Sequence, residues 1–117
     1  MSYNRWGDIY KHLKSQGVDV YSPAQHEGEC ISPYVVVKML SNNQVGRFSS
    51  SQAQYDVLIY IPKNQYSQLE DYVQEIKDLM KGLYPMIVPL GSQTPSYYDD
   101  IVKGHMVSVQ YRNNRKL

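Results

Sequence analysis

Two strand-like segments separated by a polar stretch constrain the fold of this chain more than any other feature. Residues 34–40 (YVVVKML) form a nearly continuous β-branched and apolar run, typical of a central strand that is covered on both faces. Residues 52–61 (QAQYDVLIYI) are predicted to form the next strand, with Ala53, Tyr55, Val57, Ile59 and Ile61 on one face, until Pro62 ends the run. The intervening Ser41–Ser51 is polar and rich in serine. The two strands are therefore predicted to pair antiparallel through an exposed hairpin arm.

Two amphipathic segments predict helices. The first runs from about Tyr3 to Gln16, and Gly17 suits a left-handed helix end. The second begins at Ser67, which forms an S-x-x-E capping box with Glu70. Each segment has a single apolar stripe at helical spacing, made of Trp6, Ile9, Tyr10 and Leu13 in the first and of Leu69, Val73, Ile76, Met80 and Leu83 in the second.

Three further segments complete the expected sheet. Val18–Tyr21 is a short extended segment, and Tyr84–Gly91 is an edge strand because Pro89 cannot donate to a ladder. His105–Arg112 alternates in the manner of a strand, whereas Gln93–Asp100 is predicted to be an exposed loop.

These elements predict an α+β fold. A helix with one apolar stripe must bury that stripe against another element, so both helices are expected to pack on one face of the sheet. The sheet is predicted to be mixed and mainly antiparallel, with about four to five strands. One domain is expected to span residues 1–117, with the arm at residues 41–51 and a basic tail at residues 112–117.

Charge and composition exclude several classes of protein. Twelve Lys and Arg residues against 11 Asp and Glu residues give a net charge of +1, which argues against a dedicated nucleic-acid binder. No apolar run approaches the roughly 20 residues that span a bilayer, and the first residues lack an apolar signal segment. The single cysteine, Cys30, is consistent with folding in a reducing cytoplasm.

The sequence offers few groups for chemistry. Cys30 with His26 or His105 lacks the signatures of a nucleophilic cysteine site, and a lone cysteine is usually a small buried hydrophobe. His26, Glu27, Glu29 and Cys30 contain metal-ligand types but no second Cys/His pair, so a solvated acidic loop is the preferred interpretation.

The pair Asp99–Asp100 near His105 is expected to cap a turn rather than bind a cation. Phosphate-binding glycine loops and the hydrolase elbow motif are also missing from the sequence. The chain is therefore expected to be neither an enzyme nor a cofactor-binding protein.

An excess of tyrosine points to subunit contacts instead. The chain has 12 Tyr but one Phe and one Trp, and tyrosine suits half-buried surfaces and interfaces. Candidate interface residues lie in the two polar excursions and the basic tail: Arg47, Phe48, Tyr97, Tyr98, Arg112, Arg115 and Lys116. The tail is predicted to contact protein carboxylates rather than DNA.

The order of elements resembles a known family. The segments HEGECISPYVVVK, YDVLIYIPKNQYSQLEDYV and GLYPMIVPLGSQTPSYYDDIVKGHMVSVQYR, taken together, resemble the tail terminator (tail completion) proteins of long-tailed bacteriophages and prophages. The resemblance covers nearly the whole chain and depends on its overall pattern, without a short diagnostic motif.

The resemblance implies a structural role in the virion, with assembly in the host cytoplasm. Such proteins form a hexameric ring on the head-proximal end of the tail tube, where the ring stops polymerisation of the tube protein and presents a surface to the head connector. They have an α+β fold, no cofactor and no catalytic residues, and DNA passes through the ring only in transit.

Two alternatives stay open. The first is that the chain is another neck protein, such as a head-closure stopper or connector. A small nucleic-acid or ligand-binding module is the other class, since a sheet with surface tyrosines can stack bases.

Overall fold

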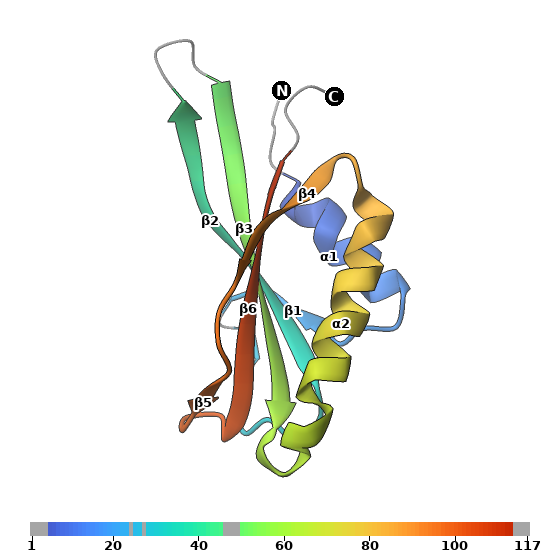
Figure 1. The fold of residues 1–117 in the computed structure, drawn as a ribbon, viewed down its shortest axis with the longest axis vertical. Coiled ribbons are helices and arrows are strands. Elements are labelled where there is room, and N and C mark those ends of the chain that lie inside the picture. The colour runs from blue at the N-terminus through green and yellow to red at the C-terminus, as the bar shows by residue number, and fades with distance from the viewer. Residues whose placement is uncertain (1–4, 24, 27, 46–49, 114–117) are drawn as a thin grey trace.

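The computed structural model describes residues 5–23, 25, 26, 28–45 and 50–113, of which 40–45 and 50–53 are described by their backbone. The described chain has extents of 48 × 25 × 24 Å. Its elements follow the order α1 (Trp6–Ser15), β1 (Val20–Tyr21), β2 (Tyr34–Val45), β3 (Ser50–Pro62), η2 (Lys63–Gln68), α2 (Leu69–Met80), η3 (Lys81–Leu83), β4 (Ile87–Gln93), β5 (Tyr97–Asp99) and β6 (Gly104–Asn113), shown in Figure 1.

The strands form one mixed, mainly antiparallel sheet. Its order is β1-β2-β3-β6-β4, with β5 paired to β6 beyond the end of β4. The contact between β1 and β2 is parallel, and the other pairs are antiparallel. The predicted α+β class is confirmed, and short β5 brings the sheet to six strands.

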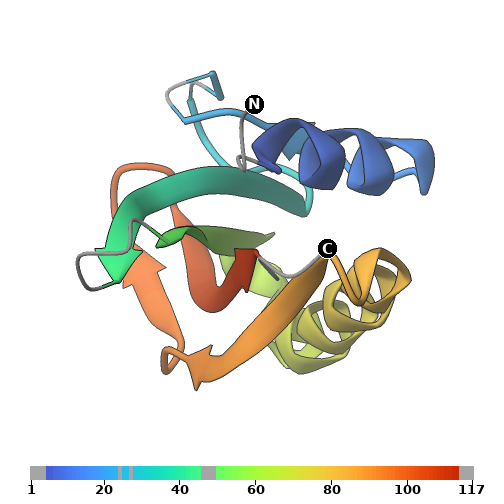
Figure 2. The same ribbon diagram turned by 90° about the horizontal axis from the view of Figure 1, so that it is seen from above.

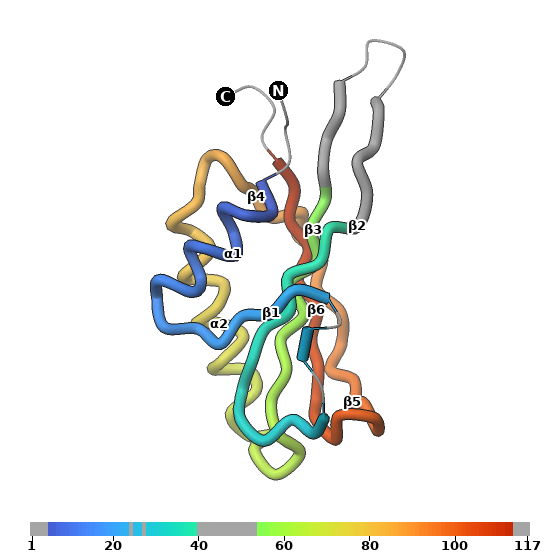
Figure 3. Tube along the Cα trace, turned by 180° about the vertical axis from the view of Figure 1, so that it is seen from behind, coloured from blue at the N-terminus to red at the C-terminus, as the bar shows by residue number. Residues whose placement is uncertain are grey.

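Both helices lie on the same side of the sheet (Figures 1 and 3), and the sheet curves strongly when seen from above (Figure 2). The helical stripes meet alternate residues of the strands, and Ile9, Leu13, Val57 and Ile59 have no exposed surface. Each such buried aliphatic side chain contributes about 1.5–3 kcal/mol. The indole N–H of Trp6 adds a polar link, since it donates to the carbonyl oxygen of Val37 at 2.7 Å.

The helix ends agree only in part with the sequence patterns. Gly17 has φ +86° and follows α1, as predicted. The capping box was a wrong prediction, because Ser67 lies within η2 and α2 begins at Leu69 without a side-chain cap. The backbone N–H of Leu69 donates to the carbonyl of Tyr66, so the preceding 3₁₀ turn supplies a partner that a capping side chain would otherwise provide.

Two polar stretches contain more strand than the sequence suggested. In the arm, β2 and β3 stay paired from Ser41↔Gln54 to Val45↔Ser50, although the register shifts between Met39 and Ser41. In the predicted loop, Tyr97 to Asp99 form β5. They pair with residues 104–106 of β6, along the part of its edge that β4 does not cover. Arg47 and Phe48 lie outside the described residues.

Candidate functional site

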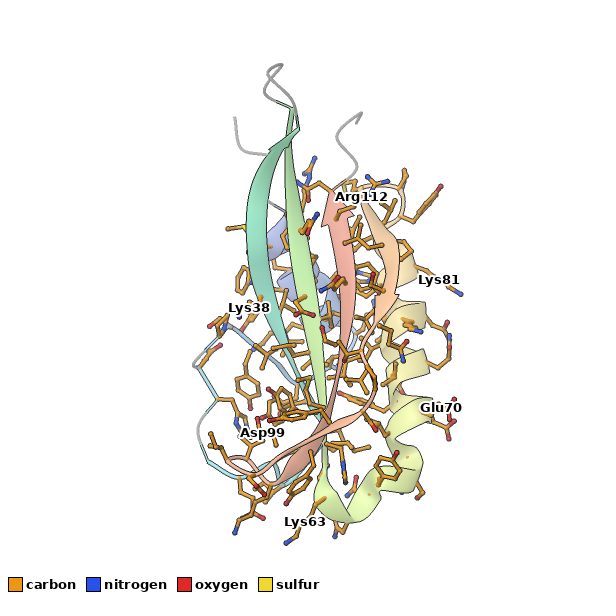
Figure 4. All side chains as sticks on the ribbon, turned by 60° about the vertical axis from the view of Figure 1, so that its left-hand side comes forward. Lys38, Lys63, Glu70, Lys81, Asp99 and Arg112 are labelled. Atoms are coloured by element: carbon orange, nitrogen blue, oxygen red, sulfur yellow. The ribbon has the colours of Figure 1, made fainter. Side chains whose placement is uncertain are left out.

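The predicted interface residues do not form one cluster. Tyr97 and Tyr98 lie on β5, opposite Met106 and His105 of β6. Arg112 lies near the other end of β6, about 20 Å along the strand from Met106 at roughly 3.3 Å per residue. Asp99 and Arg112 accordingly lie toward opposite ends of the molecule (Figure 4).

The remaining predicted residues of this set, Arg47, Phe48, Arg115 and Lys116, are outside the described part of the chain. Arg112 is half-buried, and its guanidinium donates to the carbonyl of Asn113 at 3.2 Å. Of the predicted set, the structure therefore describes Arg112 and the two neighbouring tyrosines of β5.

Large exposed side chains lie at the β5 end of the sheet, in what we call the tyrosine tip: Tyr66, Tyr97, Tyr98 and Ile101. Tyr98 lies on the face of His105 and Tyr66, whereas Tyr97 lies on the other face, opposite Met106. Tyr97 is 59% exposed and Ile101 is 88% exposed. Large apolar side chains that are exposed close together often mark a site of protein–protein contact. Tyr66 comes from η2, and its hydroxyl lies 3.3 Å from the Ser96 hydroxyl. The tip therefore joins segments that are 30 residues apart in the sequence.

The ring of His105 lies between those of Tyr66 and Tyr98. It lies 4.6 Å from the Tyr66 ring and 5.2 Å from the Tyr98 ring, centroid to centroid. The backbone N–H of Ile101 donates to the Asp99 carboxylate at 2.9 Å, which fixes the turn after β5. Asp100 beside it is exposed, so the tip combines apolar side chains with negative charge.

A groove between α2 and β4 forms a second surface, which the sequence did not predict. Its volume is about 690 Å³, and Met80, Ile87, Val109 and Tyr111 supply much of its apolar lining. Lys77 and Lys81 of α2 also line it. Burial raises the pKa of the Tyr111 phenol to about 12.

The groove is open because β4 departs from β6. Their register shifts between Pro89 and Gln93, and Gly91 within the shift has φ +81°. Gly91 and Ser92 of this bulge line the groove. A proline and a glycine two residues apart in an edge strand are the sequence signal for such a bulge.

Several other tyrosines serve packing. The rings of Tyr34 and Tyr60 stack with centroids 4.7 Å apart, and the His26 ring stacks on Tyr34 at 3.9 Å. Tyr21 meets the Tyr34 ring edge-on at 5.6 Å. Burial raises the pKa of the Tyr34 phenol, so the ring stays neutral in this stack.

Cys30 is a buried residue of the loop that precedes β2. Its thiol donates to the Ser32 carbonyl at 3.4 Å, and within the described contacts neither His26 nor His105 bonds to it. Burial raises the pKa of the Cys30 thiol to about 11, with a smaller contribution from Glu29. A protonated, covered thiol is a poor nucleophile.

Across the residues that the structure describes, no group of three or more His, Cys, Asp or Glu side chains is arranged to hold a metal ion. None of the described helices is long and apolar enough to cross a membrane. No model of a known protein family matches the chain, and no curated protein matches it.

Proposed function

We propose that this chain is a structural protein of phage assembly that forms a ring, with six subunits, on the head-proximal end of the tail tube. In this role it stops tube elongation and offers a surface to the head connector or stopper protein. The proposal combines the resemblance to tail terminators with the surface properties of the subunit. It assigns no catalytic residue and no cofactor to the chain.

The tyrosine tip is the observation that carries the proposal. Tyr97, Tyr98 and Ile101 expose large apolar side chains in one short segment, next to Tyr66. Tyrosine is enriched among the residues that dominate binding at protein interfaces. A subunit with such a surface is suited to a protein partner, and in a ring that partner is a neighbouring subunit or the tube.

The shape and charge of the chain fit the same role. The paired backbone of residues 42–45 and 50–53 extends past the sheet, because pairing of β3 with β6 begins only at Gln54. This arm is a second element suited to reach a neighbour. A net charge of +1 suits a ring through which DNA passes without being held, since each tight phosphate contact would add affinity.

The test is tube assembly with the tube protein of the same phage or prophage. Electron microscopy is expected to show tubes of limited length with a closed ring of this chain at one end. The double variant Tyr97→Ser/Tyr98→Ser should fold and lose this activity, whereas Lys63→Ser, an exposed change on η2, should keep it.

Two outcomes would contradict the proposal. A ring on the head connector without tube binding would favour a stopper or connector. A monomer that ignores tubes and binds DNA with steeply salt-dependent affinity would favour a nucleic-acid module.

A further inference from the structure

We propose that the tyrosine tip of one copy docks into the α2–β4 groove of the next copy. Each subunit then contributes one tip and one groove to a head-to-tail contact. The inference deepens the proposed ring function and rests on it, because it names the surfaces that join neighbouring subunits.

The two surfaces match in polarity. Met80, Ile87 and Val109 give the groove an apolar lining, and its volume of about 690 Å³ is in the range that accepts bulky groups. The tip presents Tyr97 and Ile101 largely exposed. Docking would remove apolar area from water on both copies, which is the main driving force for association.

The two surfaces also match in charge. Lys77 and Lys81 line the groove, and Lys77 has no ion-pair partner among the described residues. Lys81 is paired with Asp78 at 3.4 Å, in an exposed contact that contributes little. The tip carries Asp99 and Asp100 beside its apolar side chains. Opposite charges around an apolar contact favour one docking orientation.

The tip and the groove of one copy cannot meet each other. β4 pairs with residues 109–113 of β6, whereas β5 pairs with residues 104–106. Lys81 lies beside α2, and Asp99 lies away from it at the other end of the sheet (Figure 4). The contact must therefore join different copies, and unlike surfaces that meet head to tail generate a ring when the rotation closes.

The predicted contact is weak in isolation. Two tyrosines and one isoleucine bury on the order of 500 Å² at most, which is below the roughly 800 Å² per partner of a stable interface. Free subunits are thus expected to be largely monomeric. The tube end, which holds several subunits together, raises their effective concentration and completes the ring.

Site-directed cross-linking tests the pairing. One protein carries Ile101→Cys in the tip and a second carries Ser92→Cys at the groove; both positions are exposed. A short thiol-specific bifunctional reagent should join the two proteins as heterodimers when they are mixed on tail tubes. The unsubstituted protein is the control, because its only thiol, Cys30, is buried.

Charge reversal provides a second readout on folded proteins. Asp100→Lys in the Ile101→Cys protein, or Lys77→Glu in the Ser92→Cys protein, should each lower the cross-linked yield about two- to fivefold. Combining the two reversed partners should restore the yield. Reversal of Lys63, which lies outside the groove, is the matched control.

The outcomes separate this inference from the proposed function. Two results on rings bound to tubes would overturn the docking and leave the ring function intact. One is a cross-link between two cysteines at position 101, and the other is the absence of a cross-link between positions 92 and 101. Heterodimers that form at high protein concentration without any binding to tubes would support the docking and contradict the tail role. Failure of the doubly reversed pair to restore the yield would show that residues 100 and 77 do not face each other across the contact and would overturn the docking.

Discussion

The hydroxyl of Tyr55 donates a hydrogen bond to Oδ1 of Asn113, 2.7 Å away in the interior of the protein. The same hydroxyl accepts from the backbone N–H of Arg5 at 2.6 Å. Tyr55 in the centre of the sheet thereby links the residue before α1 to the end of β6. These contacts join segments that are 50 and 58 residues away from it in the sequence.

Replacing Tyr55 by Phe should therefore weaken the fold. Asn113 and Arg5 would each lose a buried or partly buried hydrogen bond, and such losses cost about 1–3 kcal/mol. Urea denaturation should show this decrease in the free energy of unfolding. Tyr111→Phe is the matched control, because within the described residues the Tyr111 hydroxyl has no hydrogen bond, and a loss of equal size there would contradict the argument.

Gly104 leaves room for a close approach between β6 and the loop that contains Cys30. A Cβ at this position would lie 2.9 Å from the Ile61 carbonyl oxygen and 3.0 Å from the Cys30 Cβ. Gly104→Ala should lower the stability by about 1–3 kcal/mol, as overpacking does. Gly7→Ala, where nothing lies within 4 Å, should instead raise it by up to about 1 kcal/mol through helix propensity. Thermal unfolding of both variants checks the contrast in sign.

The elements that follow local patterns could be predicted from the sequence. The apolar stripe from Leu69 to Leu83 predicts a helix, and α2 is present there with its apolar face buried. The alternation in residues 105–112 predicts a strand, and β6 is present there. In both cases the period of apolar residues matches the period of the element, so burial selects one structure. The exact start of α2 could not be predicted, because a 3₁₀ turn competes there with the capping box.

The candidate surfaces depend on contacts between distant segments. Tyr97 and Tyr98 were predicted, but Tyr66 meets Tyr98 through the ring of His105, which is 39 residues further along the chain than Tyr66. The groove requires the register shift between Pro89 and Gln93. Pro89 and Gly91 are a local signal for a bulge, but the partner of each strand depends on how β4 and β5 share the edge of β6.

Asp56 should make stability depend on pH. Burial raises the pKa of its carboxyl, and the opposing effect of Lys38 is smaller. A carboxyl with a raised pKa in the folded protein binds its proton more tightly there than in the unfolded chain. Stability should therefore rise as the pH falls through the folded pKa toward the ordinary value of 3.8. Asp56→Asn should remove this dependence of stability on pH. The free energy of unfolding of the variant should exceed that of the parent protein most near neutral pH.

Asp78 provides the control of opposite sign for that experiment. Hydrogen bonds from Gln74 and then Lys81 lower the pKa of its carboxyl. The stabilisation of the fold by Asp78 should be present at pH values above its ordinary pKa of 3.8. It should be lost as the pH falls through the lowered pKa of the folded protein. Denaturation series of Asp78→Asn and Asp56→Asn across pH should hence diverge in opposite directions from the parent protein.

Cys30 should be inert in the folded protein. Its pKa of about 11 keeps the thiol protonated at neutral pH, and burial denies access to reagents. Mass spectrometry after treatment with iodoacetamide should find little modification in buffer and complete modification in urea. Cys30→Ser should keep tube binding apart from a modest loss of stability, and a folded variant that fails to bind tubes would give the thiol a function.

Shortening the arm tests whether it contacts a partner. The pair Ser41↔Gln54 marks where β3 leaves β6, so replacing residues 42–53 by Asn-Gly should close a tight hairpin without touching the ladder to β6. The core pairs Val35↔Ile59 and Val37↔Val57 lie on the other side of this point and should keep their packing. Urea denaturation is expected to change little, whereas ring formation on tubes should fall. A variant with the full-length arm and the changes Arg47→Ser and Phe48→Ser distinguishes the effect of these side chains on ring formation from the effect of arm length. Normal ring formation by the shortened protein would show that the arm has no partner.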